Sequence, residues 1–456
     1  MIHQGRWDPT MVGRNLVRPG ILWGRTSLTK NASDLQKGPQ GASLDSLKNW
    51  LADKTPWFRD PDKVFWSSGY LSHHGPGWST SVRAPRSDET ASEVGNGENL
   101  KGWFLGFGST WIRLRGDEHD LIWPVLDWAS IPGVTNDRVD TFPGQDMKNG
   151  FGYAYGTTDF VGGASDGQVS AFAYDYKVSA VTGKKAWFQI PDALVALGAG
   201  LSFDVPRPVS TSIDQRWARG AVTLGNPSLA ILHTDSVATA TARWFHHDSV
   251  GYWIPAAESL VVGTKIRTGT WKSVDTLYTD TLSSGRVFFA RLEHGRKSSS
   301  EGYAYAVVPG VSADSMERWV SASSIEIVSN TPRVQAIVQG TYRAMVFHAP
   351  DTAAFADGMR ITVDRPCALL RRDSSGATRW TASFPDRSAG SLTISVKEGS
   401  GGWKRMDIRL PDHPRAGESR SLLESTGVRD LPRGGFLPRP RWIGKELELP
   451  FACTEA

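Results

Sequence analysis

Cysteine is scarce in this sequence, and long apolar runs are missing. Among 456 residues only Cys367 and Cys453 are cysteines, which excludes a scaffold of several disulfides and a cysteine-rich zinc site. One bridge between them and two free thiols both stay open, and the general burial of cysteine favours the free thiols. No run of about 18 apolar residues occurs, so we expect no transmembrane helix and no membrane partner.

An excess of charge of one sign is missing as well. The chain has 51 lysines and arginines against 47 acidic residues, a formal net charge of +4. This mild basic excess suits an acidic polymer but is far from a nucleic-acid-binding tail, so we expect no nucleic-acid partner. Residues 1–9 show no basic segment followed by an apolar stretch, so we expect no secretory signal there.

Patterns typical of metal sites are also missing. His73-His74 and His246-His247 are adjacent pairs, and neighbouring residues on a strand point to opposite faces, so such a pair seldom chelates one ion. No His-Glu-x-x-His or calcium-loop spacing occurs. We therefore expect satisfied or surface histidines, no metal and no other cofactor.

One Gly-x-Ser-x-Gly string occurs, at residues 163–167. A nucleophile elbow needs a strand before the serine and a helix after it. Residues 168–176 alternate instead like a strand. We therefore interpret Ser165 as part of a glycine-rich turn.

Glycine and proline are abundant. The 47 glycines and 26 prolines are spread along the chain, and such a density of turn formers argues against a mainly helical protein. From about residue 70, apolar residues alternate with polar ones between turn signals, which predicts a mainly β protein of the antiparallel sandwich type. Strands are expected at residues 324–328, 334–338, 368–372, 378–382, 392–396 and 406–410.

Two segments depart from the strand pattern. Residues 43–52 predict an amphipathic helix, because Ser43 can cap it and three leucines share one face. After Pro411 the tail is richer in proline, arginine and serine. We expect an irregular wrap there, with a helical turn around Leu422 and Leu423.

The densest group of polar residues lies between Glu93 and Trp103. Two carboxylates, Glu93 and Glu98, and two amides, Asn96 and Asn99, fall within seven residues. Such a group can hold a catalytic base or orient sugar hydroxyls by hydrogen bonds. The alternative is a solvated turn, because Asn-Gly is a strong hairpin signal.

A second group, Arg14 and Arg18, places two arginines four residues apart. On one face of a helical turn they could clamp a carboxylate or a sulfate. The alternative is an exposed basic stretch. The 19 tryptophans likewise have two interpretations, since aromatic faces stack on sugar rings but mostly fill cores.

Taken in order, these segments resemble polysaccharide lyase family 8, which includes chondroitin, hyaluronate and xanthan lyases. The most specific stretch is 93–103, and the resemblance covers roughly residues 5–412. The other segments that carry it are Gly13-Arg14-x-x-x-Arg18, 74–82, 123–128, 131–135, 160–167, 184–188, 196–200, 250–253, 267–271, 293–295, 303–310 and 363–367.

The resemblance implies a helical α/α toroid, then a large antiparallel β supersandwich of the galactose-mutarotase-like type, then a smaller C-terminal β sandwich. On this basis we expect four parts. They are a short toroid remnant with linker at 1–56, the supersandwich at 57–340, the small sandwich at 341–412 and a tail at 413–456.

The resemblance also implies β-elimination at a uronic acid, in an enzyme that acts on an acidic polysaccharide outside the cell or in the periplasm. Arg14 and Arg18 would bind the sugar near the cleaved bond, and Glu93 would orient a catalytic group from across the cleft. Asn96 would support Glu93. We expect Arg14, Arg18 and Glu93 to be catalytic and Asn96, Glu98 and Asn99 to bind substrate, with no metal needed.

The sequence departs from the family at its start. The family's toroid supplies an asparagine, a histidine and a tyrosine that carry the elimination, and no segment here corresponds to them. Three hypotheses follow: a truncated or split lyase, a non-catalytic carbohydrate-binding or structural β protein, and a chain completed by a separate toroid partner.

Overall fold

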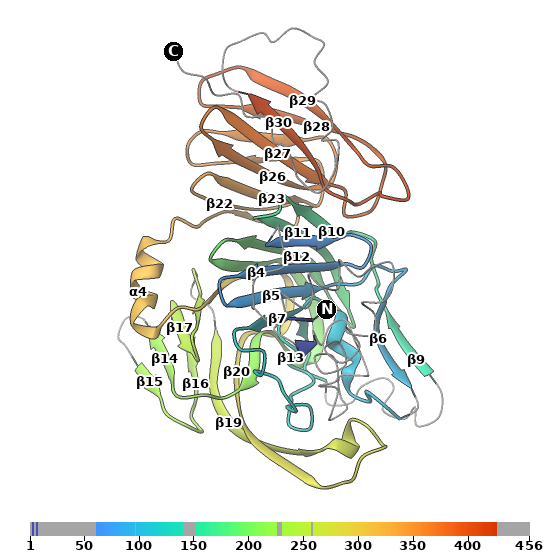
Figure 1. Cartoon of the computed structure of the whole chain (residues 1–456), viewed down its shortest axis with the longest axis vertical. Helices are drawn as coiled ribbons and strands as arrows, with labels where there is room; N and C mark the ends of the chain where they lie inside the picture. The colour runs from blue at the N-terminus through green and yellow to red at the C-terminus, as the bar shows by residue number, and fades with distance from the viewer. Residues whose placement is uncertain are drawn as a thin grey trace, which may run out of the picture.

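The computed structural model describes residues 61–95, 97–139, 151–225, 230–256 and 259–425, together with the short strands β1 (Ile2–His3) and β2 (Arg6–Trp7). These parts are mostly β, as predicted, and the helix expected at 43–52 lies outside them. The layers stack along the long axis of the molecule (Figure 1). No helix in the described ranges is long and apolar enough to cross a membrane.

A 12-stranded antiparallel sheet forms the centre of the larger domain. Its spine is the pair β13 (Ala193–Trp217) and β20 (Leu282–Pro309), strands of 25 and 28 residues. The other members are β8 (Thr135–Asn136), β10 (Val161–Ser165), β11 (Ser170–Val178), β12 (Val181–Ile190), β14 (Val222–Gly225), β15 (Ala230–Leu232), β16 (Val237–Ala240), β17 (Trp244–His247), β18 (Val250–Trp253) and β19 (Leu260–Thr270).

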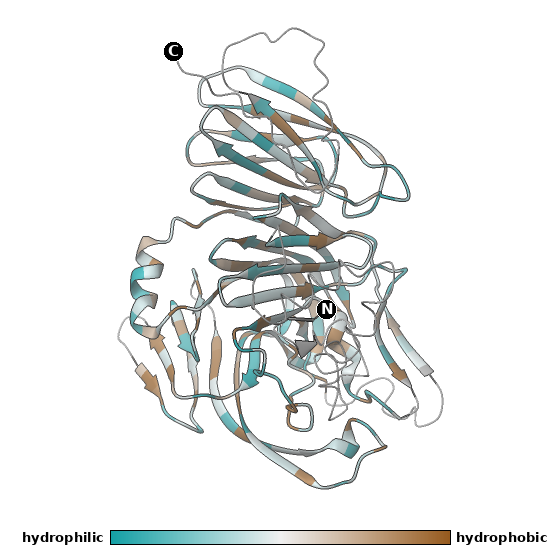
Figure 2. Cartoon of the chain, in the orientation of Figure 1, coloured by the Kyte–Doolittle hydropathy of each residue, from teal (hydrophilic) through white to brown (hydrophobic). Residues whose placement is uncertain are grey.

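Strands β11 to β13 are buried on both faces. Phe172 and Tyr174 of β11 enter one hydrophobic core, whereas the alternate residues Ala171 and Ala173 enter a second core on the opposite face. Hydrophobic (brown) and hydrophilic (teal) residues alternate along many other strands (Figure 2). Successive side chains of a strand point to opposite faces, so the period-two pattern places alternate residues in two different layers.

A four-stranded sheet packs against the first of these cores. It comprises β3 (Asp62–Phe65), β4 (Tyr70–Gly75), β5 (Trp78–Arg83) and β7 (Ser109–Arg113). Leu71, Val82 and Ile112 from this sheet join Phe172 in the same core. Between β5 and β7 the chain forms β6 (Thr90–Gly95), which pairs only with β9 (Phe151–Tyr155) among the described strands, and the 3₁₀ helix η2 (Gly102–Gly106).

The C-terminal domain is a sandwich of two antiparallel sheets around a third core. The six-stranded sheet holds β21 (Glu326–Asn330), β22 (Val334–Gln339), β23 (Tyr342–Phe347), β26 (Cys367–Ser374), β27 (Ala377–Ser383) and β30 (Arg420–Ser425). The four-stranded sheet holds β24 (Asp351–Ala354), β25 (Arg360–Val363), β28 (Gly390–Lys397) and β29 (Trp403–Leu410).

The strands expected at residues 334–338, 368–372, 378–382, 392–396 and 406–410 are confirmed. Strands β21 and β22 pair antiparallel across the turn that begins after Asn330, and β26 pairs with β27 in the same way. The expected domain border at 340 falls between β22 and β23, which are neighbours in one sheet. Cys367 is a free thiol buried in the core of this sandwich.

The helical turn expected around Leu422 and Leu423 is wrong. Residues 420–425 form β30, which pairs with β27 from Ala382↔Arg420 to Ala377↔Ser425. The unpaired edge of β27 offers backbone donors and acceptors that a local helical turn would leave unused. Sheet pairing with a distant segment therefore overrides the local pattern.

The two domains meet through a junction that combines apolar packing with hydrogen bonds. The second core combines β11–β13 with Ile337, Val346 and Leu370 of the six-stranded sheet. Asn330 donates its side-chain amide to the carbonyls of Gly198, at 3.0 Å, and of Tyr303, at 3.1 Å. The helix α4 (Ala313–Ala322) lies in the connection between the domains, at one side of the molecule (Figure 1), and packs against β17 and β18.

A buried ionic cluster stabilises the middle of the large sheet. The guanidinium of Arg216 is fully buried and lies 2.6 Å from the carboxylate of Asp214. Glu118 accepts backbone hydrogen bonds from Leu114 and Arg115, at 2.9 and 2.7 Å. Burial alone would raise the pKa of Glu118, but the backbone donors and the charge of Arg216 hold it at about 2.

This cluster predicts an acid-sensitive fold. Because the pKa of Glu118 is lower in the folded chain, the ionised carboxylate stabilises the fold above pH ~4.5, and this contribution is lost as the pH falls toward 2. Glu118→Gln should lower the free energy of unfolding at pH 7 by about 2–3 kcal/mol and flatten its dependence on pH. Urea unfolding at several pH values, with the exposed Glu326→Gln as control, measures both effects; an unchanged pH dependence would contradict the assignment.

Candidate functional site

The polar group singled out in the sequence lies at the end of β6 and in the turn that follows. Glu93 is half-buried on β6, whereas Glu98 and Asn99 are buried in the turn. Asn99 adopts a left-handed backbone with φ 57°, which asparagine tolerates better than most residues. The turn thus brings one half-buried carboxylate and one buried carboxylate to the same end of the ribbon.

Asn99 holds this turn together from inside. Its side-chain amide donates to the carbonyl of Glu93 at 2.8 Å and to the hydroxyl of Ser92 at 3.3 Å. Ser92 in turn donates to the carbonyl of Gly102 at 2.6 Å. Buried polar groups are stable only when they are hydrogen-bonded, so these bonds fix the backbone that carries Glu93.

The turn is clamped from outside by the segment after β19. This segment includes the 3₁₀ helix η3 (Trp271–Ser273). The amide of Leu100 donates to the carbonyl of Val274 at 2.9 Å, and the amide of Thr276 donates to the carbonyl of Gly97 at 2.8 Å. Residues about 175 positions apart in the sequence therefore determine the shape of the turn together.

Aromatic side chains flank Glu93 on the ribbon. Glu93 pairs directly with Tyr153 of β9, and directly opposed residues project from the same face. Tyr155 follows two residues later on that face, with its ring 6.0 Å from that of Tyr153. Both tyrosines are about half exposed, at 46% and 53%, so each offers an aromatic surface beside the carboxylate.

An arginine cluster lies on the large sheet near the start of the clamping segment. The carboxylate of Asp127 accepts from Arg138, at 3.2 Å, and from Arg267 of β19, at 3.3 Å. The guanidinium groups of Arg267 and Arg291 flank the ring of Phe289 at 5.7 and 5.6 Å. Arg267 precedes the end of β19 by three residues, so β19 links this cluster to the segment that contacts the turn 97–102.

The cationic groups here are partly desolvated. Burial lowers the pKa of Arg291, and the nearby guanidinium of Arg138 lowers it further. Burial also lowers the pKa of Lys101, whose ammonium donates to the hydroxyl of Ser273 at 3.1 Å. Desolvated cations interact strongly with an incoming anion, because less water screens them.

The Gly-x-Ser-x-Gly string spans the end of β10 and the turn into β11, so Ser165 is the last residue of a strand and does not lie inside the predicted turn. Ser165 ends β10, and β11 rather than a helix follows. The hydroxyl of Ser165 donates to the carboxylate of the buried Asp62 at 2.6 Å, and Asp62 also lies 3.2 Å from Nδ1 of His73. Asp62 stands between the serine and the histidine, so the three groups form a structural link between β3, β4 and β10.

The adjacent histidines point to opposite faces of their strands. On β17, His246 contacts the carbonyl of Val311 at 2.9 Å, whereas His247 is buried and stacks on Phe288 with ring centres 4.0 Å apart. Burial, reinforced by the charge of Arg216, lowers the pKa of His247 to about 3. Within the described ranges, no group of three histidine, cysteine, aspartate or glutamate residues could hold a metal ion.

Three of the predicted site residues lie outside the described residues: Arg14, Arg18 and Asn96. Glu93, Glu98 and Asn99 are brought together in one turn, and their roles stay predictions. Sequence reasoning assigned no role to Asp127, Arg138, Arg267 and Arg291. Up to 164 positions separate them, so no local spacing could have revealed that they meet.

Family models match this architecture over most of the described chain. Residues 61–319 match the super-sandwich domain of polysaccharide lyase family 8, and residues 326–393 match the C-terminal beta-sandwich domain of that family. The first match alone covers more than half of the chain. This chain therefore belongs to polysaccharide lyase family 8.

Individual relatives agree with this assignment. Chondroitinase-AC from Pedobacter heparinus is 30% identical over 366 residues, which are 78% of this chain and 51% of that protein. A hyaluronate lyase from Thermasporomyces composti is 28% identical over 73% of this chain and 43% of its own length. A xanthan lyase from Bacillus sp. is 26% identical over 71% of this chain and 36% of its own length. The chain spans about half the length of these curated relatives, or less.

Solved structures share the fold. A chondroitinase AC lyase matches with a TM-score of 0.84 and 27% identity, covering 92% of this chain and 63% of that chain. The xanthan lyase of Paenibacillus matches with a TM-score of 0.80 at 18% identity, which shows the fold alone. The mainly β architecture of a supersandwich followed by a smaller sandwich is therefore confirmed.

Two glycines with the same backbone conformation test the clamp on the turn. Gly97 has φ +76°, and an added Cβ would lie 1.9 Å from the hydroxyl of Thr276. Gly77 has φ +75°, with nothing within 4 Å of an added Cβ. Gly97→Ala should therefore destabilise the chain by about 1–3 kcal/mol more than Gly77→Ala, which carries only the backbone strain.

Urea unfolding of the two variants measures this difference. Hydrogen exchange at the amides of Leu100 and Thr276 should accelerate in Gly97→Ala and stay unchanged in Gly77→Ala. Equal stability of the two variants would contradict the close contact between the turn and the segment after β19.

Proposed function

We propose that this chain acts as a polysaccharide lyase that cleaves a uronic-acid-containing polysaccharide by β-elimination and leaves a 4,5-unsaturated uronate. The observation that carries this proposal is the match of both β domains to the lyase family. The substrate class rests on relatives named as chondroitin, hyaluronate and xanthan lyases. We infer a site of action outside the cell or in the periplasm, where such polymers occur.

Cationic and aromatic side chains of the candidate site support a polyanionic sugar as the ligand. The proton at C5 of a uronate becomes acidic enough to remove only when the adjacent carboxylate is neutralised. Partly desolvated cations, such as Arg291 and Lys101, are suited to that task, since they interact strongly with an anion. The half-exposed rings of Tyr153 and Tyr155 offer apolar surface for the faces of pyranose rings.

The predicted residues take distinct parts in this proposal. Glu93 would orient a catalytic group from the ribbon, and Asn96 and Glu98 would contact the substrate. Asn99 is fully buried and donates to the Glu93 carbonyl, so we propose that it acts on the substrate through the position of that strand. Arg14 and Arg18 would bind the sugar beside the cleaved bond.

A second candidate is carbohydrate binding without catalysis by this chain. The observation that favours it is the extent of the family match, because residues 61–319 and 326–393 correspond to the two β domains of the family. A helical partner segment that completes the catalytic set would then be needed for cleavage.

A lyase assay tests the proposal. The purified chain is incubated with chondroitin sulfate, hyaluronan, xanthan and alginate, and the ultraviolet absorbance of the unsaturated product is followed. We expect product from at least one polymer. Glu93→Gln should lower the rate by about 100-fold or more while the fold is retained, because a misplaced catalytic group costs that much.

The control is Glu326→Gln, which alters an exposed carboxylate on β21 of the other domain. Its rate should equal that of the unaltered chain. Polymer binding without product would favour the second candidate, and equal rates for Glu93→Gln and the control would remove Glu93 from the mechanism.

A further inference from the structure

The four-stranded sheet of the C-terminal sandwich has one face that no other element of the described chain covers. Along β28 and β29, the apolar residues Leu392, Ile394, Val396 and Ile408 enter the core of the sandwich. The alternate residues of β24, β25, β28 and β29 share the opposite face, because they are paired in register. Figure 1 places this sheet at the end of the molecule farthest from β19.

This face is strongly cationic. Arg360 of β25, Lys397 of β28, and Arg405 and Arg409 of β29 project from it, against one carboxylate, Asp407. The side chains of Arg405 and Arg409 are 70% and 71% exposed. Arg405 lies 3.9 Å from Asp407, and Arg409 donates to Asp412 at 2.7 Å. Such exposed ion pairs contribute little free energy, so an external anion can compete for these guanidinium groups.

An exposed tryptophan lies among these cations. Trp403 begins β29 opposite Lys397 and is 54% exposed, although a tryptophan is usually well buried. The remaining outward positions of the sheet are serines, threonines and one alanine. A flat aromatic ring stacks on the apolar face of a sugar. Cationic groups bind its acidic groups, and hydroxyls bind its hydroxyls.

We propose that this face is a second binding surface for acidic polysaccharide, separate from Glu93 and the turn 97–102. The four strands lie about 4.8 Å apart, which gives a width of roughly 14 Å. Strands β28 and β29 have eight residues each and β24 and β25 have four, so the platform is about 27 Å long at β28 and β29 and about 14 Å long at β24 and β25, enough for several sugar units. The choice of polysaccharide rests on the proposed function; the cationic and aromatic character of the face does not. Its role is to hold the polymer at a distance from the site of cleavage.

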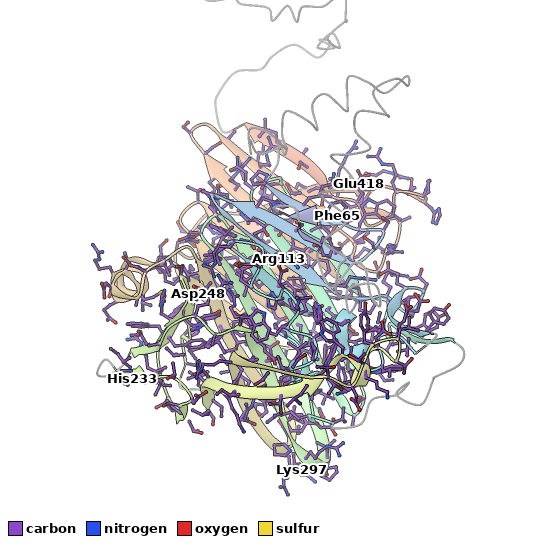
Figure 3. All side chains as sticks on the ribbon, turned by 60° about the horizontal axis from the view of Figure 1, so that its bottom comes forward. Phe65, Arg113, His233, Asp248, Lys297 and Glu418 are labelled. Carbon is purple, nitrogen blue, oxygen red and sulfur yellow. The ribbon has the colours of Figure 1, made fainter. Side chains whose placement is uncertain are left out.

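Affinity electrophoresis in gels containing chondroitin sulfate, hyaluronan or xanthan tests the proposal. Arg405→Ala with Arg409→Ala should weaken binding at low salt by about tenfold or more, and salt should diminish the difference. Trp403→Ala should weaken binding by about tenfold, and Trp403→Tyr should restore most of it. The matched control is Lys177→Ala with Lys297→Ala, two exposed lysines of the other domain; Lys297 lies at the opposite end from Glu418 (Figure 3).

A residue-level measurement separates this face from the cleavage site. Oxidation of Trp403, followed by mass spectrometry, should slow at least severalfold when polymer is bound and should be unaffected by a neutral glucan.

Unaltered affinity in the face variants together with unprotected Trp403 would overturn the proposal, as would a wild-type chain that binds none of the polymers. Tighter binding of duplex DNA or of anionic vesicles than of any polysaccharide would overturn the choice of ligand. Protection of Trp403 in a chain that forms no unsaturated product would leave this surface standing while the proposed lyase activity fails.

Discussion

The pairing of β13 with β20 is the constraint on which the rest of the structure depends. These two strands run through the 12-stranded sheet, and both cores of the larger domain pack against them. The carbonyls of Gly198 on β13 and Tyr303 on β20 accept hydrogen bonds from Asn330 and so support the C-terminal sandwich. The pairing is interrupted between Asp204 and Val209, where prolines lack backbone donors, so the long ribbon can bend there.

The candidate site is assembled from loops that this sheet holds in place. The turn 97–102 gains its shape from Asn99 inside it and from the segment after β19 outside it. The exposed rings of Tyr153 and Tyr155 lie on β9 beside Glu93, and Asp127 brings Arg138 and Arg267 together from different parts of the chain. A rigid scaffold with polar loops at its edge is the usual way in which proteins present binding groups.

Much of the β architecture could be predicted from the sequence. The strict alternation of residues 392–396 and 406–410 reflects one buried face and one solvated face, so the pattern and the structure agree. The helical turn predicted around Leu422 and Leu423 is wrong because residues 420–425 pair with β27. This long-range interaction cannot be predicted from the local sequence. The contacts of Asp127 escaped prediction for the same reason.

The sequence by itself determined the period-two strands, the turn after β6 and the resemblance to polysaccharide lyase family 8, because each depends on residues that are neighbours in the chain. Only the tertiary structure decided that Asn99 faces inward, that Arg267 shares the carboxylate of Asp127 with Arg138, and that Trp403 stays exposed among cations. These outcomes depend on which distant strands pair and which faces they cover. Packing then determines how buried each residue is and which charges lie near it, and the sequence of a single strand does not identify the strands with which it pairs.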